Sequence, residues 1–167
     1  GKSSLGGGSL GRKEATGYGC VYIASYMLAV RKQELAGKTC LVSGSGNVAI
    51  YTIEKLHQLG ATAITCSDSA GTLYHAEGIN LATLKQIKER EQGRLTSYLQ
   101  HHPEAVYIPC SDYPADGHAV WRYKADLAFP CATQNELTQA DAEALVANGC
   151  LAVSEGANMP STQEAVA

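Results

Sequence analysis

The string TCLVSGSGNVA, from Thr39 to Ala49, constrains the fold of this chain more than any other feature. It joins a short apolar run to a glycine-rich turn and an apolar-periodic segment, the GxGxxA form of the dinucleotide-binding fingerprint. Gly44 allows the tight turn, Gly46 brings the backbone close to a pyrophosphate, and Ala49 lets the helix pack on the strand. The unpaired N–H groups at the start of that helix would face the phosphates.

The rest of the chain continues this alternation of strands and helices. The periodicity predicts a strand over 39–43, a helix over 47–59 and a strand over 62–66, the length and punctuation of a βαβ unit. Further elements are expected as helices over 14–32, 81–91, 94–100 and 138–148 and as strands over 106–108, 126–130 and 151–153. This order predicts an α/β fold, a doubly wound parallel sheet of the Rossmann type that is incomplete at its C-terminal end.

One dinucleotide-binding domain is expected over 1–167, with an N-terminal loop and helix over 1–37 and a Rossmann core over 38–160. Residues 1–11 are rich in glycine and serine, which is typical of a flexible linker. The chain begins without Met, and its last residues, 163–167, resemble a helix cut short. We therefore expect a piece of a longer protein whose N-terminal substrate domain lies outside this chain.

Composition excludes several classes of function. The formal net charge of −3 argues against a nucleic-acid binder, and the longest apolar run, over 20–30, is too short to span a bilayer. None of the 6 cysteines stands in a CxxC pair, so we expect reduced structural thiols in a cytoplasmic protein and no metal site. The spacing of the histidines to Ser, Cys and Asp residues matches no catalytic or metal-binding pattern. None of them is therefore assigned to catalysis or to a metal, and they are His57, His75, His101, His102 and His118. Trp121, Tyr113 and Tyr123 are expected in the core or an interface.

Four polar strings follow predicted strands, and such strings meet at one edge of an open α/β sheet, where ligands bind. They cover 44–49, 67–69, 130–135 and 155–158. The alternative is that they are ordinary turn residues, since Gly, Asn, Ser and Asp are common in turns. The whole set favours a binding edge more than any single string does.

The second strand leaves the choice of nucleotide open. Asp68 lies where an acidic residue takes the ribose hydroxyls, which favours NAD. Ser67 and Ser69 flank it, and Lys88 and Arg94 follow on the next segment; hydroxyls and cations favour a ribose 2′-phosphate. The alternative for the two cations is a solvated helix face.

The segment over 7–19, GGSLGRKEATGYG, resembles the GGSxxRPEATGYG signature of hexameric glutamate dehydrogenases. Three further strings agree in order, over 43–49, 130–136 and 155–160, and the SDS at 67–69 is similar to the NADP-type microbial enzymes. Lys13 stands where the signature has proline. The resemblance implies reversible deamination of L-glutamate to 2-oxoglutarate and ammonia with NADP, in a homo-hexamer.

The resemblance also implies roles for matching residues. Thr16 would lie near the nicotinamide, Asn47 and its turn at the pyrophosphate, and Ala132, Thr133 and Gln134 at the nicotinamide ribose. The full cofactor-binding set is Thr16, Gly44, Ser45, Gly46, Asn47, Val48, Asp68, Ser69, Lys88, Arg94, Ala132, Thr133, Gln134 and Asn158. Arg12 and Asn158 would lie near the substrate. The catalytic lysine and aspartate of the family belong to its N-terminal domain, so this chain holds no catalytic residue and is expected to bind cofactor without turnover.

Two alternatives remain. The first is a related leucine, phenylalanine or valine dehydrogenase, against which the strings over 7–17 and 131–136 speak. The second is a nucleotide-binding module without chemistry, which would also bind nucleotide without turnover.

Overall fold

The computed structural model describes residues 7–90, 94–132 and 137–154, except the side chains of 7–14 and 89–90. The helices are α1 (Gly7–Val30), α2 (Asn47–Gln58), α3 (Leu81–Lys85), which continues as the π-helix η1 (Gln86–Arg90), α4 (Tyr98–His101) and α5 (Gln139–Ala147). Short 3₁₀ turns are η2 (Leu95–Ser97), η3 (Cys110–Asp112) and η4 (Ala119–Arg122). The strands are β1 (Thr39–Val42), β2 (Thr62–Ala63), β3 (Thr65–Asp68), β4 (Gly71–Tyr74), β5 (Val106–Pro109), β6 (Leu127–Phe129) and β7 (Ala152–Val153).

Two sheets share one stretch of chain. The parallel sheet has the order β2-β1-β6-β7, and the second sheet, β3-β4-β5, is antiparallel. Strands β2 and β3 are separated only by Ile64, whose N–H donates to Cys40 O at 3.0 Å. The segment 62–68 therefore leaves β1 and goes on to pair with β4.

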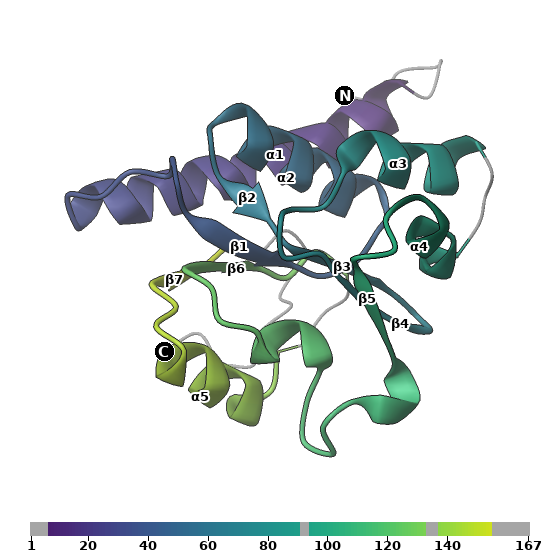
Figure 1. Ribbon diagram of the computed structural model, residues 1–167. Helices are drawn as coiled ribbons and strands as arrows, with labels where there is room; N and C mark the ends of the chain where they lie inside the picture. Colours follow the sequence, from purple (N-terminus) through teal and green to yellow (C-terminus); the bar gives the residue numbers. More distant parts are fainter. Residues whose placement is uncertain (1–6, 91–93, 133–136, 155–167) are drawn as a thin grey trace.

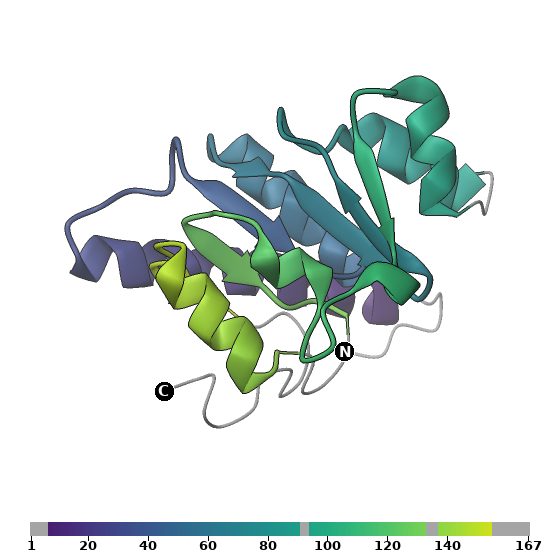
Figure 2. The same cartoon turned by 60° about the horizontal axis from the view of Figure 1, so that its bottom comes forward.

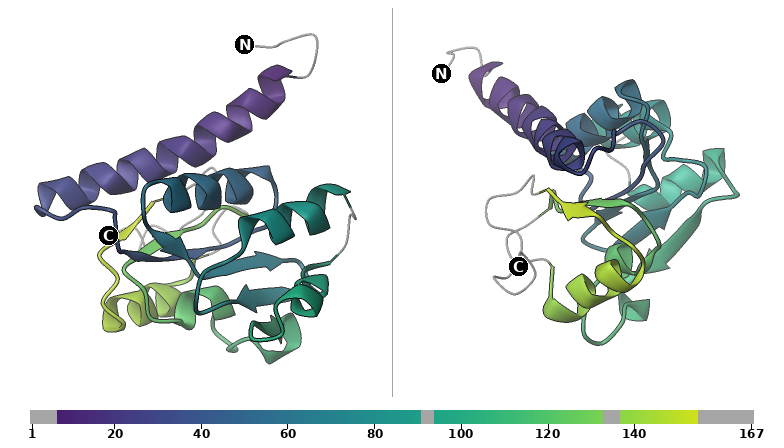
Figure 3. Two further views of the ribbon diagram at one scale, coloured as in Figure 1. Left: turned by 45° about the horizontal axis from the view of Figure 1, so that its top comes forward. Right: turned by 90° about the vertical axis from the view of Figure 1, so that its left-hand side faces the viewer.

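Helices cover both faces of the parallel sheet, as the sequence predicts. Helices α1, α2 and α3 lie on one side and α5 on the other (Figures 1 and 3), and Figure 2 shows α5 and the η4 segment in front of the sheet. On β1, Cys40 and Val42 pack against the α1–α2 side, while Leu41 packs against Trp121 and Leu145 on the other. This alternation follows from the two-residue period of a strand.

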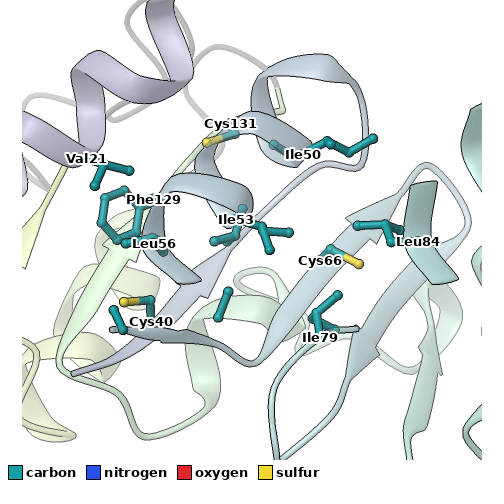
Figure 4. Close-up of a cluster of buried hydrophobic side chains, with 14 of the residues drawn as sticks. Val21, Cys40, Ile50, Ile53, Leu56, Cys66, Ile79, Leu84, Phe129 and Cys131 are labelled. Carbon is teal, nitrogen blue, oxygen red and sulfur yellow. The ribbon is translucent and has the colours of Figure 1, made fainter. Parts of the chain in front are cut away.

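The larger core lies between α2 and the strands. Ile53 and Leu56 of α2 meet Phe129 of β6 there, with Val21 of α1 beside them (Figure 4). The inward faces of α1 and α2 are fully buried, since Val21, Ala24, Leu28, Ala49, Ile53 and Leu56 are all 0% exposed. Trp121 is also fully buried, as expected of a core residue.

The predicted parallel sheet is confirmed in β2-β1-β6-β7, but the second sheet was not predicted, because Gly71–Tyr74 forms β4 and turns the chain back antiparallel to β3. Two local predictions of the sequence analysis are wrong. Ser67 and Asp68 stand inside β3 rather than in a loop after it. Backbone 7–11, expected as a linker, begins helix α1, although glycine is a poor helix former.

The helix expected over 81–91 is likewise two pieces, α3 and η1, in which the hydrogen bonding changes from α to π. The helix after Thr138 is confirmed. Thr138 caps it, its hydroxyl accepting the Asp141 N–H at 3.1 Å while the Asp141 carboxylate accepts the Thr138 N–H at 3.2 Å.

Candidate nucleotide-binding site

The glycine-rich turn between β1 and α2 has the geometry that the fingerprint predicts. Gly44 has a φ of +86°, and a Cβ there would lie 3.2 Å from Cys131 O and from Ala132 Cα. A side chain at Gly44 would therefore be strained and crowded at once. A Cβ on Gly46 would meet nothing within 4 Å, so space is open in front of this residue.

Helix α2 begins beside that open space without a side-chain cap. Gly46 occupies the N-cap position, and its carbonyl accepts the first helical bond from Ile50 N–H at 3.0 Å. The N–H groups of Asn47, Val48 and Ala49 precede that bond and have no partner within the helix. They and the helix dipole form a site for an anion.

Three buried hydroxyls hold the strand ends that frame the turn. Ser67 Oγ accepts the Gly44 N–H at 2.8 Å, and Ser43 Oγ accepts the Cys131 N–H at 3.0 Å. Thr65 Oγ1 accepts from Val42 N–H at 2.9 Å and donates to Val42 O at 3.0 Å. The Thr65 and Ser67 hydroxyls thus replace backbone bonds that are lost where β3 diverges from β1, and Ser43 links the end of β1 to the end of β6.

A cavity of about 650 Å³ lies at these strand ends. Its lining comes from the β1–α2 turn, the β3–β4 turn, η1, the 110–118 segment and the end of β6: Gly44, Ser45, Gly46, Asn47, Val48, Ser67, Asp68, Ser69, Lys88, Tyr113, His118, Cys131 and Ala132. The structure therefore brings nine of the predicted cofactor-binding residues to one cavity. That size suits a small-molecule ligand.

The other predicted residues stand apart from this lining or outside the description. Thr16, on α1, and Arg94, before η2, are exposed and do not line the cavity. The backbone of Arg12 lies in α1, and its side chain lies outside the described residues. Thr133, Gln134 and Asn158 also lie outside them.

The Asp68 carboxylate is engaged by the protein itself. Its Oδ1 accepts the N–H groups of Ala70 and Gly71 at 3.0 and 2.9 Å and the Tyr107 hydroxyl at 3.2 Å. Its Oδ2 accepts the Leu95 N–H at 3.4 Å. Burial, and after it the charge of Asp68, raises the pKa of Tyr107 to about 12, which keeps this phenol a donor. Asp68 thus closes the β3–β4 turn and fixes the backbone on both sides of Ser69, which lies in that turn.

Tyr113 and His118 line the cavity although the sequence analysis gave them no role there. Their rings lie 4.4 Å apart between centroids, and the Tyr113 hydroxyl is 2.7 Å from Thr72 Oγ1. His118 Nδ1 accepts the Val120 N–H at 3.2 Å, and burial lowers the pKa of this histidine. Both belong to the 110–123 segment, which has no periodicity that could place it at the sheet edge.

The model of the glutamate/leucine/phenylalanine/valine dehydrogenase family matches residues 7–167. The chain belongs to this family. Among its relatives, the NADP-specific glutamate dehydrogenase of Helicobacter pylori strain J99 is 55% identical over 166 residues, which cover 99% of this chain and 37% of that protein. The NADP-specific glutamate dehydrogenase of Escherichia coli K12 is 46% identical over 168 residues, again 99% of this chain and 36% of the relative.

Solved structures agree with the fold. The crystal structure of glutamate dehydrogenase from Plasmodium falciparum superposes with a TM-score of 0.83 at 42% identity, covering 93% of this chain and 32% of that one. The α/β fold expected from the sequence is thus shared with these enzymes, and the chain spans a little over a third of the length of the curated relatives.

No helix within 7–90, 94–132 or 137–154 is long and apolar enough to cross a membrane. All 6 cysteines lie among the described residues as free thiols, four of them buried.

Proposed function

We propose that this chain is the coenzyme-binding part of an NADP-dependent glutamate dehydrogenase. The uncapped start of α2, which opens onto the cavity beside Gly46, carries the proposal. A pyrophosphate placed there would accept the N–H groups of Asn47 and Val48 and meet the positive end of the helix dipole. The names of the relatives support glutamate over leucine, phenylalanine or valine as the substrate of the complete protein.

The same cavity favours NADP over NAD. Ser69, in the β3–β4 turn, and Lys88, in η1, line it and supply a hydroxyl and a cation for a ribose 2′-phosphate. Asp68, the residue that favoured NAD, has both carboxylate oxygens in hydrogen bonds to the protein. We propose that it shapes the turn and leaves the ribose to its neighbours. On the family resemblance, Arg94 would lie near the 2′-phosphate and Thr16 near the nicotinamide.

The reaction of the complete protein would be reversible deamination of L-glutamate to 2-oxoglutarate and ammonia. NADP would accept the hydride. In this chain the first turn of α2 would hold the pyrophosphate, and Ala132, with Thr133 and Gln134, would border the nicotinamide ribose. Arg12 and Asn158 would lie on the substrate side. We propose that the chain by itself binds nucleotide without turnover and that the complete protein is a cytoplasmic homo-hexamer, both on the family resemblance.

Calorimetric titration of the chain with NADPH and NADH tests the assignment. We expect tighter binding of NADPH, and Lys88→Ala should weaken it about 10- to 100-fold, since a hydrogen bond to a charged group contributes about 1.5–3 kcal/mol. NADH binding should change little. Lys85→Ala is the matched control, because Lys85 lies on the same segment but pairs with Glu54 at 3.1 Å.

Equal affinity for the two nucleotides, or the same loss in both lysine variants, would contradict the 2′-phosphate assignment. Glutamate-dependent formation of NADPH by the chain alone would contradict the proposal that it lacks turnover.

A further inference from the structure

A second group of side chains with ligand chemistry lies away from the nucleotide cavity, at the other end of β4. It consists of His75, His102 and Glu104, the histidine–glutamate cluster. His75 Nε2 is 2.9 Å and His102 Nδ1 is 3.6 Å from the same atom, Glu104 Oε2. One ligand atom from each residue falls within 4.8 Å of the others.

The antiparallel sheet brings these residues together. Tyr74, the last residue of β4, is paired with Val106, the first residue of β5, so His75 and Glu104 flank the same end of the ladder. A tight turn then returns the chain from α4 into β5, with Ala105 N–H donating to His102 O at 3.0 Å. Backbone hydrogen bonds therefore fix all three positions.

The ring nitrogens that face away from Glu104 have partners of their own. His75 Nδ1 lies 2.6 Å from the Tyr98 hydroxyl, which also accepts the Asn80 N–H at 2.8 Å. His102 Nε2 lies 3.0 Å from Thr83 Oγ1. Metal-binding histidines usually have such an outer partner, which fixes the ring and selects the nitrogen that is free to ligate.

The inner nitrogen of His75 is poorly satisfied. His75 is 5% exposed, and among the described residues its Nε2 has no hydrogen bond of acceptable geometry, although Glu104 Oε2 is 2.9 Å away. The close approach of His75 Nε2 and Glu104 Oε2 without a hydrogen bond is the arrangement expected of two atoms that ligate the same metal ion. The Glu104 side chain is 51% exposed, so the cluster is open to solvent on one side.

We propose that the histidine–glutamate cluster binds a zinc-type divalent cation. Two imidazoles and one carboxylate, with water in the fourth position, form a tetrahedral set typical of zinc. Bonds of about 2.1 Å would separate tetrahedral ligand atoms by about 3.4 Å, and the observed separations of 2.9 and 3.6 Å lie on either side. The ion would tie the end of β4 to the turn before β5. This proposal does not rest on nucleotide binding.

Titration of the metal-free 167-residue chain with Zn²⁺ tests the site, with Co²⁺ as a spectroscopic probe. We expect one equivalent of Zn²⁺ to bind, raise the melting temperature and give Co²⁺ the intense visible bands of a tetrahedral site. His102→Ala and Glu104→Gln should each weaken binding at least about tenfold and abolish the bands. His101→Ala is the matched control, since His101 is the exposed neighbour of His102 and should leave binding unchanged.

Both test variants replace side chains that reach the surface, so circular dichroism should show the native fold in each. Failure of the unmodified chain to bind one equivalent, or equal affinity in His102→Ala and His101→Ala, would overturn the proposal. NADPH titrations of the same variants keep the two sites distinct, because loss of the metal site predicts no change in nucleotide affinity.

Discussion

At the scale of the residue, buried hydroxyls decide where the strands of the parallel sheet end. Thr65 is 0% exposed, yet it lies in a strand whose backbone has begun to leave β1. Its hydroxyl serves both polar groups of Val42 and so avoids the cost of an unsatisfied buried N–H, about 1–3 kcal/mol. A sequence shows a threonine in an apolar run but not which backbone group it will reach.

The role of His118, also at the scale of a single residue, depends on the protonation state of its ring. Burial is the main cause that lowers its pKa below 6.5, and nearby Asp141 opposes the shift. The neutral ring is also required for the bond from Val120 N–H to Nδ1. Between the lowered folded pKa and the unfolded value, the unfolded chain binds more protons, so the folded state loses stability as the pH falls below about 6.5.

Replacing His118 by Asn should remove this part of the pH dependence. Asn supplies an acceptor at the same N-cap position and does not titrate. Urea unfolding of the nucleotide-free chain at several pH values from 7.5 to 5 measures the effect. We expect the free energy of unfolding to fall less steeply below pH 6.5 in the variant. Parallel curves would show that His118 titrates alike in the folded and unfolded states.

At the scale of the element, the crossing of α1 over α2 depends on a glycine. A Cβ on Gly17 would lie 2.9 Å from Tyr51 Cβ and 3.0 Å from Val48 O. Both atoms belong to α2, and Val48 lies in the first turn of that helix and lines the nucleotide cavity. Gly17 of the ATGYG string, over 15–19, is thus explained by packing, because the missing side chain lets α1 lie close to the start of α2.

Gly17→Ala should therefore destabilise the chain by about 1–3 kcal/mol, the usual cost of overpacking. Gly19→Ala is the internal control, because a Cβ there meets nothing within 4 Å. In the same helix that change should stabilise by about 0.5–1 kcal/mol. Thermal unfolding of both variants measures the difference. A Gly17 variant as stable as the Gly19 variant would mean that the two helices can separate at no cost.

Elements that depend on local signals were predictable. The βαβ unit around Gly44 and the capped helix after Thr138 follow from turn, cap and periodicity signals within a few residues. The β3–β4 hairpin was missed because 67–69 was interpreted as a binding string or as ordinary turn residues, and neither interpretation placed a strand after it. The hairpin depends on hydrogen bonds from the Asp68 carboxylate to Ala70 and Gly71, which the sequence alone does not show.

At the scale of the whole molecule, the sites too divide into parts that local sequence signals predict and parts that depend on the fold. Most of the nucleotide cavity was predictable, since its fingerprint is contiguous and the carboxyl ends of parallel strands meet at one edge. Tyr113 and His118 were not, because an irregular segment carries them there. The histidine–glutamate cluster was excluded on spacing, since 27 positions separate His75 from His102 in the chain and only the pairing of β4 with β5 brings them together.

The strand that two sheets share has a consequence for the order of folding. Thr65 and Tyr74 pair across a hairpin, whereas Cys40 must find Leu127, 87 positions away. Loop closure costs more entropy for the second contact, so we expect the hairpin to form first and present segment 62–68 as a template for β1. Pulsed hydrogen exchange during refolding should protect the amides of β4 before those of β1. Simultaneous protection would mean that the two sheets nucleate as one.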